Sequence, residues 1–190
     1  MLAAKNIVIE LLSAVIWGTG IGLLMAITAN GFVYLVIFAT EYRTSFTLFE
    51  FHLQGQTYSL SSILSLLTAA VIISVIRKCL DIKNWEGIAD SIYVAHKENP
   101  KIDTKKGLGS TFASLVVISG GGSVGQYGPL VHFGSTIGLF IKNFFKLKMS
   151  PDIFIGCGVA AAIAAGFNAP LAGILFAHEA ILRHFSLRAI

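Results

Sequence analysis

From Gly120 to Gly138 the chain reads GGGSVGQYGPLVHFGSTIG, and this stretch decides the fold. A glycine-rich turn runs into Gly128-Pro129 and then into a helix-like segment with small residues. Pro129 suits the first helical position, where its missing N–H costs nothing, so a helix is expected to begin near Tyr127 or Gly128. The unpaired amides and partial positive charge of a helix N-terminus can bind an anion without any charged side chain. The stretch therefore predicts anion permeation, and the alternative is a glycine hinge packed between helices.

The composition is that of a multi-pass integral membrane protein. Of 190 residues, 55% are hydrophobic and only 13% are charged, and the mean hydropathy is +0.76. Soluble domains are rarely so poor in charge. The formal net charge of +4 does not indicate a nucleic-acid partner, because the basic residues are spread along the chain at the ends of apolar segments. Cys79 and Cys157 support neither a disulfide nor a metal site, and no metal or cofactor is expected.

The apolar segments predict an all-α bundle of tilted and broken membrane helices. One long tilted helix is expected over 7–40 and a second span over 59–79, joined by a polar loop. A short amphipathic helix over 84–97 and a charged connector over 98–106 follow. Four short membrane helices are then expected over about 107–119, 128–145, 151–165 and 170–184. Short, broken helices with small residues that allow close packing are typical of channels and transporters.

The basic residues predict the orientation in the membrane. If the expected helices cross alternately, every Lys and Arg of the 14 except Arg43 falls on one side. By the positive-inside rule this side, with the N-terminus and the basic loops, is cytoplasmic.

A second segment makes the pattern specific. Residues 166–176 read GFNAPLAGILF and are closely followed by Glu179. Gly166 is expected to end one helix, Asn168 to cap the next, and Pro170 to stand in its first turn. The segments Gly125-Gln-Tyr-Gly-Pro129 and 166–176, in this order and spacing, resemble the CLC family of chloride channels and chloride/proton exchangers.

The resemblance carries expectations about the whole protein. It covers nearly the whole chain and implies a CLC-like fold of which residues 1–190 form only the first inverted repeat, the N-terminal half of a subunit. The family's second-half Gly-x-Phe-x-Pro segment does not follow here, so the chain is expected to be an N-terminal fragment. A homodimer with one pore per subunit is expected of the full-length protein, with chloride or a similar monovalent anion as its substrate.

The resemblance also implies the residues of the site. The anion-binding groups would be the backbone amides of Gln126, Tyr127 and Gly128, together with those of Gly87 and Ile88. The helix-end motif would consist of Gly166, Phe167, Asn168 and Pro170.

Three positions depart from the family pattern. Tyr127 stands where the family usually has a glutamate that competes with the anion and carries the proton, so Tyr127 is expected to be the gate. Ala180 follows Glu179 where the family's exchangers tend to carry a second acid. Glu86 stands where an anion-coordinating serine is expected, and a carboxylate there would repel an anion. Either Glu86 is protonated, or it points to cytoplasmic water, or the alignment is shifted by a few residues.

The remaining polar residues have structural explanations. His132 is expected to be packed or hydrogen-bonded between helices rather than to relay protons, and His178 to lie at an interface. Ser110, Thr111 and Ser114 are expected to form hydrogen bonds within the bundle.

Four functions compete. The first is anion permeation like that of voltage-gated chloride channels, channel-like or uncoupled because two acids are replaced. The second is a proton-coupled chloride or fluoride antiporter that uses other acids, with Glu86 and Glu179 as doubtful candidates. The third is a non-conducting membrane subunit. The fourth, a nucleotide-binding enzyme, is rejected because no Gly-Lys-[Ser/Thr] sequence or catalytic triad spacing is present, so no enzymatic activity is expected.

Overall fold

The computed structural model describes residues 2–45, 50–53, 56–97 and 102–183, and within these ranges the chain is almost entirely helical. The predicted helical fold class is confirmed. The elements are α1 (Leu2–Ser45), β1 (Glu50–Leu53), β2 (Gln56–Ser59), α2 (Leu60–Cys79), α3 (Ile88–Ala95), α4 (Thr104–Ser119), α5 (Tyr127–Phe144), α6 (Pro151–Phe167), α7 (Pro170–Phe176) and a π-helix η1 (Ala177–Leu182).

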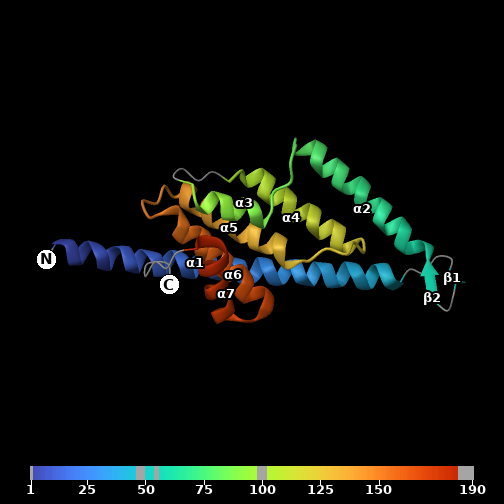
Figure 1. Cartoon of the computed structure of the whole chain (residues 1–190), viewed down its shortest axis with the longest axis horizontal. Helices are drawn as coiled ribbons and strands as arrows, with labels where there is room; N and C mark the ends of the chain where they lie inside the picture. The colour runs from blue at the N-terminus through green and yellow to red at the C-terminus, as the bar shows by residue number, and fades with distance from the viewer. Residues whose placement is uncertain (1, 46–49, 54–55, 98–101, 184–190) are drawn as a thin grey trace.

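Helix α1 runs along the length of the molecule (Figure 1). Its 44 residues extend over about 66 Å, roughly twice the hydrocarbon thickness of a bilayer. Two stretches are long and apolar enough to span a membrane, namely Leu11–Ser45 and Leu60–Cys79. Between them, within the expected polar loop, the structure places a short antiparallel hairpin in which Glu50 pairs with Ser59.

The core is built on the contact between α5 and α6. A Cβ added to Gly134 would collide with the carbonyl of Gly158, and one added to Gly138 would collide with the carbonyl of Phe154. Backbones that approach this closely require glycine, which is the small-residue packing expected of membrane helices. Helix α1 covers the other side of α6, where Ile21 and Met25 are buried beside Phe154 and Ala162.

Several helix ends differ from their expected positions. Helix α4 begins at Thr104, within the expected connector, because the carboxylate of Asp103 accepts hydrogen bonds from the amides of Lys105 and Lys106. Helix α3 covers only the middle of its expected range. The segment expected as one helix over 170–184 changes from α to π geometry after Phe176.

The expectation that Asn168 caps α7 is wrong. Asn168 has a φ of 52° and a ψ of 39°, the left-handed conformation that ends α6. Asparagine tolerates this conformation better than most residues, so it serves α6 as a terminator. The N-cap of α7 is Ala169, which has no side chain able to cap it.

Candidate functional site

A cavity of about 360 Å³ lies where the N-terminal ends of α3 and α5 meet. Gly128 lies beside α3, where an added Cβ would be in ordinary van der Waals contact with the Cδ1 atom of Ile88, 3.5 Å away. Helix α4 contributes hydroxyl side chains to the wall. The residues that line the cavity are Glu86, Gly87, Ile88, Ser110, Thr111, Ser114, Gly128, Pro129 and His132. The structure therefore brings together the two segments in which the sequence places anion-binding amides.

The N-terminus of α5 has no side-chain cap. Gln126 is the N-cap residue and its side chain makes no capping hydrogen bond. The first amides of a helix have no partner within the helix, and Pro129 has no amide hydrogen. The amides of Tyr127 and Gly128 thus remain donors at the positive end of the α5 dipole.

The N-terminus of α3 is occupied in part by its own acid. The amide of Gly87 donates a hydrogen bond of 2.8 Å to Oδ2 of Asp90. Gly87 and Ile88 both line the cavity, but an anion at this end would compete with that carboxylate for the Gly87 amide. The Gly87 and Ile88 amides, which are the two donors expected at this helix end, are therefore not equivalent, because only the Gly87 amide already has a carboxylate partner.

His132 is fully buried and belongs to a network of hydroxyl groups. Its Nδ1 lies 2.8 Å from Oγ of Ser91, and Ser91 Oγ lies 2.6 Å from Oγ of Ser135. Oγ of Ser135 also lies 2.8 Å from the carbonyl oxygen of His132. Thr136 donates to the same carbonyl oxygen at 2.8 Å, so the Ser135 proton can go either to that carbonyl or to Ser91. The network therefore holds the Nδ1 side of the His132 ring with the histidine as donor to Ser91 or as acceptor from it, and leaves Nε2 facing Glu86.

Glu86 faces the imidazole of His132 across the cavity. Its Oε2 lies 3.6 Å from Nε2 of His132, its side chain is 19% exposed, and its amide donates to Oγ of Ser110 at 2.9 Å. Among the residues that the structure describes, none forms a hydrogen bond with Nε2. Burial raises the pKa of Glu86 above its usual value, the positive charge of Lys106 opposes this, and the acids Asp90 and Asp103 add to it.

The three explanations for Glu86 can now be compared. Its side chain lines the cavity beside the α5 N-terminus rather than pointing into open water. Burial raises the pKa of Glu86, which is the direction that the first of the three explanations requires.

The ring of Tyr127 lies beside the cavity and does not line it. It stacks on Phe167, with ring centroids 3.9 Å apart and planes inclined by 27°. A Cβ added to Gly166 would lie 2.9 Å from the Tyr127 ring, so glycine makes room for this stack. The helix-end motif of Gly166 and Phe167 therefore contacts the N-terminus of α5 through Tyr127.

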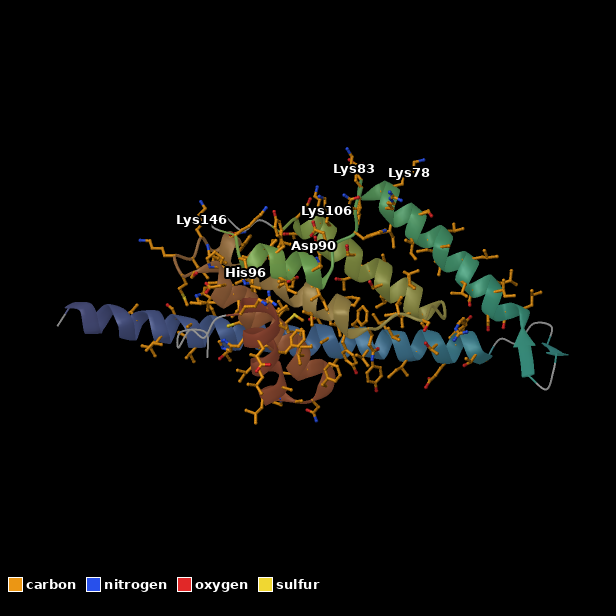
Figure 2. The ribbon with its side chains drawn as sticks, viewed as in Figure 1. Lys78, Lys83, Asp90, His96, Lys106 and Lys146 are labelled. Carbon is orange, nitrogen blue, oxygen red and sulfur yellow. The ribbon has the colours of Figure 1, made fainter. Side chains whose placement is uncertain are left out.

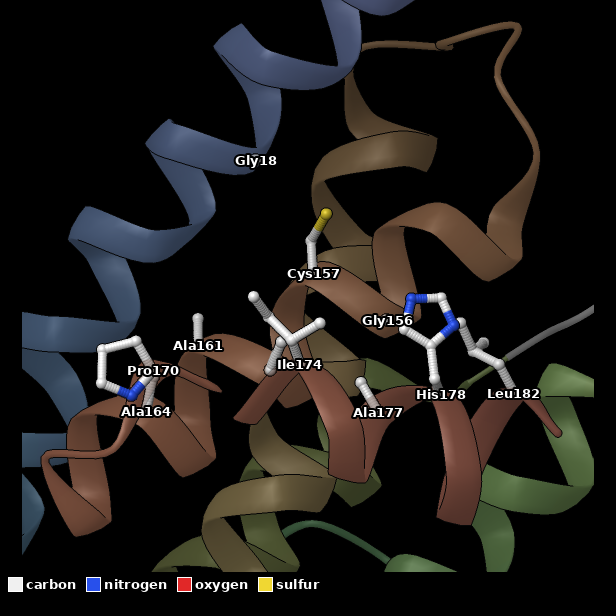
Figure 3. A pocket seen from close by; sticks show the side chains of 11 residues that line it. Gly18, Gly156, Cys157, Ala161, Ala164, Pro170, Ile174, Ala177, His178 and Leu182 are labelled. Atoms are coloured by element: carbon white, nitrogen blue, oxygen red, sulfur yellow. The ribbon is translucent and has the colours of Figure 1, made fainter. Parts of the chain in front are cut away.

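The rest of the helix-end motif and Glu179 lie elsewhere. Asn168 is exposed, and Pro170 lines a separate apolar cavity of about 260 Å³ between α1, α6, α7 and η1. Figure 3 shows the rings of His178 and Pro170 and the thiol of Cys157 around this second cavity. Glu179 is exposed on η1 and lines neither cavity.

The sequence did not single out two members of the network, Ser91 and Ser135. The sequence carried a signal for Ser135, because Ser135 and Thr136 follow His132 by three and four residues and so lie on the same face of a helix as His132. The expected hydrogen bonds of Thr111 to the Gly107 carbonyl and of Ser114 to the Ser110 carbonyl are present. Among the described residues, no three His, Cys, Asp or Glu side chains gather as a metal site would require.

Comparison with known protein families gives a match to the model described as "Voltage gated chloride channel" over residues 68–190. The matched region begins within α2 and includes the cavity, the α5 N-terminus and the helix-end motif. It covers well over half of the chain.

Proposed function

Since the chain belongs to the voltage gated chloride channel family, we propose that the cavity between α3 and α5 binds chloride or a similar monovalent anion on a membrane pathway. The resemblance found in the sequence is thereby confirmed. Members of this family are integral membrane channels or transporters of anions, so the activity to be explained is anion transport.

The observation that carries this proposal is the uncapped N-terminus of α5 at the cavity. Gly128 and Pro129 line the cavity, and the side chain of the N-cap residue, Gln126, makes no capping hydrogen bond. A helix N-terminus offers amide donors and about half a positive charge to an anion. The hydroxyl groups of Ser110, Thr111 and Ser114 on α4 are further possible donors.

We further propose that transport is channel-like or uncoupled from protons. Tyr127 and Ala180 occupy the positions at which the family's exchangers, by the resemblance, carry acids. A tyrosine hydroxyl has an ordinary pKa of about 10 and scarcely ionises near neutral pH. Alanine cannot carry a proton at all.

The proposal extends to the architecture. Residues 1–190 would form the first of two inverted repeats, in a homodimer of complete subunits, with the N-terminus and the basic loops in the cytoplasm. The gathering of lysines along one edge of the molecule supports this orientation (Figure 2).

The test is ion flux from proteoliposomes that contain the complete protein. We expect chloride efflux measured with an ion-selective electrode, and no uphill proton movement when only a chloride gradient is imposed. Protein-free liposomes provide the baseline. An absence of flux for chloride, bromide and nitrate would favour a non-conducting subunit and would contradict the proposed function.

One observation favours the second candidate, proton-coupled chloride or fluoride exchange. Glu86 is an acid within the cavity itself. If a chloride gradient drives protons uphill in the same assay, the coupled mechanism replaces the uncoupled one, and Glu86 is the first residue to test.

A further inference from the structure

An apolar groove of about 230 Å³ lies where α1 passes α4 and α5. Thr28 and Thr111 are the polar residues in its wall, and their hydroxyl groups donate to the carbonyl oxygens of the residues four positions earlier, each at 2.9 Å. Because both hydroxyl protons are used within the helices, the groove suits an apolar occupant. The residues that line it are Thr28, Gly31, Phe32, Leu35, Thr111, Phe112, Leu115, Leu130 and Phe133.

An exposed apolar strip continues this groove along α1. The strip consists of Leu35, which also lines the groove, Phe38 and Tyr42, and all three side chains are exposed. Their spacing of three and four residues places them on one face of the helix. Arg43 follows directly after Tyr42, so the strip leads from the groove to a basic residue near the end of α1.

Two polar groups without partners lie at this end of the strip. Nε of Arg43 and Oγ of Ser119 are buried atoms, and neither forms a hydrogen bond with any residue that the structure describes. The Arg43 guanidinium lies beside Gly121, where an added Cβ would be 3.2 Å from Cζ of Arg43. Ser119 stands two residues before Gly121, on the face of α4 that carries Phe112 and Leu115 of the groove.

These two groups require a partner with oxygen acceptors. A buried donor without an acceptor loses free energy relative to its hydrated state, and a guanidinium binds most strongly to a negatively charged oxygen. Within the described part of the chain, no carboxylate forms an ion pair with Arg43. A ligand that fits the whole feature is therefore apolar at the groove and anionic at Arg43.

The spacing along α1 matches the depth of one lipid leaflet. About three helical turns, or about 16 Å, separate Phe32 in the groove from Arg43. The hydrocarbon core of a bilayer is about 30 Å thick, so one leaflet contributes about 15 Å. A lipid with its phosphate at Arg43 thus reaches the groove with the far end of an acyl chain.

We propose that the groove and the strip bind one acyl chain of a phospholipid, and that Arg43 and Ser119 bind its phosphate group. The bilayer supplies this ligand, because the chain belongs to a family of integral membrane proteins and α1 carries a stretch able to span a membrane. Arginine offers two parallel N–H groups to phosphate oxygens, and basic residues beside membrane helices bind lipid head groups. The bound lipid lies in the leaflet on the Arg43 side, which is the outer leaflet in the proposed orientation.

The lipid site can be tested independently of the anion site. Apart from Thr111, the residues that line the groove do not line the cavity between α3 and α5. Lipid binding is therefore measured directly, and no chloride flux is needed for the result.

Native mass spectrometry of the complete protein in detergent provides the measurement. Dioleoyl phosphatidylglycerol, dihexanoyl phosphatidylglycerol and inorganic phosphate are titrated separately. We expect the dioleoyl lipid to bind at least about tenfold more tightly than the dihexanoyl lipid, because a short chain does not reach the groove and buries less apolar surface. Inorganic phosphate should bind more weakly than either lipid.

Gly31→Leu fills the groove. A Cβ added to Gly31 meets nothing within 4 Å, and leucine is favoured over glycine within a helix, so this variant is expected to fold. It should bind the dioleoyl lipid about tenfold more weakly and lose the preference for long chains. Gly20→Leu is the matched control, because Gly20 is also an exposed glycine of α1 with open space around it but lies outside the groove. The control should bind lipid as the wild type does.

Arg43→Gln removes the charge at the other end of the site. It should weaken the binding of both lipids by about five- to tenfold and keep the preference for the dioleoyl lipid. Lys148→Gln is the matched control, because Lys148 is an exposed basic residue between α5 and α6, and it should keep wild-type affinity.

Several results would overturn the proposal. These are equal binding of the two lipids by the wild type, equal binding of the dioleoyl lipid by Gly31→Leu and the wild type, and unchanged binding by Arg43→Gln. Inorganic phosphate that binds as tightly as the dioleoyl lipid would indicate a site for free anions and would also overturn it.

A second measurement uses the wild type alone. Phosphatidylglycerol with a photoreactive diazirine at the end of one acyl chain should crosslink to the peptides that contain Leu35 and Phe112, and an excess of dioleoyl phosphatidylglycerol should prevent this. Crosslinks to α2 without any to these two peptides would contradict the site.

Discussion

At the scale of single residues, Tyr127 connects two helix ends. Its ring stacks on Phe167 at the end of α6, in space that glycine at position 166 leaves open. The next residue, Gly128, lines the cavity. A ring in this position lies beside the α5 amides that are proposed to bind the anion. That Tyr127 acts as the gate stays a prediction, and its test is whether removal of the ring opens the pathway.

Replacement of Tyr127 should change flux in two distinct ways. Tyr127→Ala removes the ring next to the α5 N-terminus and should raise chloride flux several-fold. Tyr127→Glu should introduce a pH dependence with a midpoint near that of an ordinary carboxylate, about pH 4. Both are measured as chloride efflux from proteoliposomes at several pH values.

Tyr34→Ala is the matched control, since Tyr34 is an exposed tyrosine on α1 outside the cavity, and its flux should equal that of the wild type. If both Tyr127 variants keep the wild-type flux and pH response, the side chain does not gate the pathway.

At the scale of elements, the approach of α5 to α6 holds the site in place. Gly134 meets the Gly158 carbonyl and Gly138 meets the Phe154 carbonyl, so two turns of α5 lie against the backbone of α6. His132 and Ser135 occupy the same buried stretch of α5, where they meet Ser91 of α3. A change in the α5–α6 distance would therefore also move the imidazole relative to Glu86.

A methyl group at position 134 should separate these helices. Gly134→Ala places Cβ against the Gly158 carbonyl and 3.1 Å from Cβ of Ala162. Overpacking of this kind costs about 1–3 kcal/mol, and more where backbone must move. We expect the melting temperature in detergent, followed by fluorescence-detected size-exclusion chromatography, to fall by several degrees.

The control for this change is Gly20→Ala on α1, where an added Cβ meets nothing within 4 Å. Alanine is favoured over glycine within a helix by about 1 kcal/mol, so this variant should be as stable as the wild type or slightly more stable. Equal melting temperatures for the two variants would show that α5 and α6 do not depend on this contact.

At the scale of the whole molecule, charge is distributed unevenly. Figure 2 shows Lys78, Lys83, Lys106 and Lys146 along one edge, although they lie on four separate segments of the chain. Arg43 is the one basic residue that the predicted topology places on the opposite side of the membrane. It lies beside the glycine turn at Gly121. This distribution fits the positive-inside rule with the lysine edge in the cytoplasm.

The native cysteines offer a test of this orientation. Cys79 is exposed at the end of α2, directly after Arg77 and Lys78, whereas Cys157 is partly buried, with its Sγ 3.5 Å from a Cβ built on Gly18 of α1. A membrane-impermeant maleimide should modify the protein in inside-out vesicles and not in right-side-out vesicles. Cys79→Ser should abolish modification of the peptide that contains residue 79, and labelling of that peptide from the outer side alone would contradict the proposed topology.

The sequence by itself determined the helical class, the helix starts near Gly128-Pro129 and Pro170, and the family. These features depend on short-range properties: apolar runs set where helices form, and Gly and Pro set where they begin. The same local patterns led to a wrong prediction for Asn168, because an asparagine between two helices can either cap the second helix or end the first. Only the geometry of the connection between α6 and α7 decided that it ends α6.

The tertiary structure alone decided the chemistry of the cavity. Nothing in the spacing of Glu86, Ser91 and His132 along the chain indicates that they meet, since α4 and a long connection separate α3 from α5. Their meeting depends on which face of α5 turns toward α3 once its glycines pack against α6. A side-chain pair of this kind is fixed by packing between distant segments, and that information is not contained in any local pattern of residues.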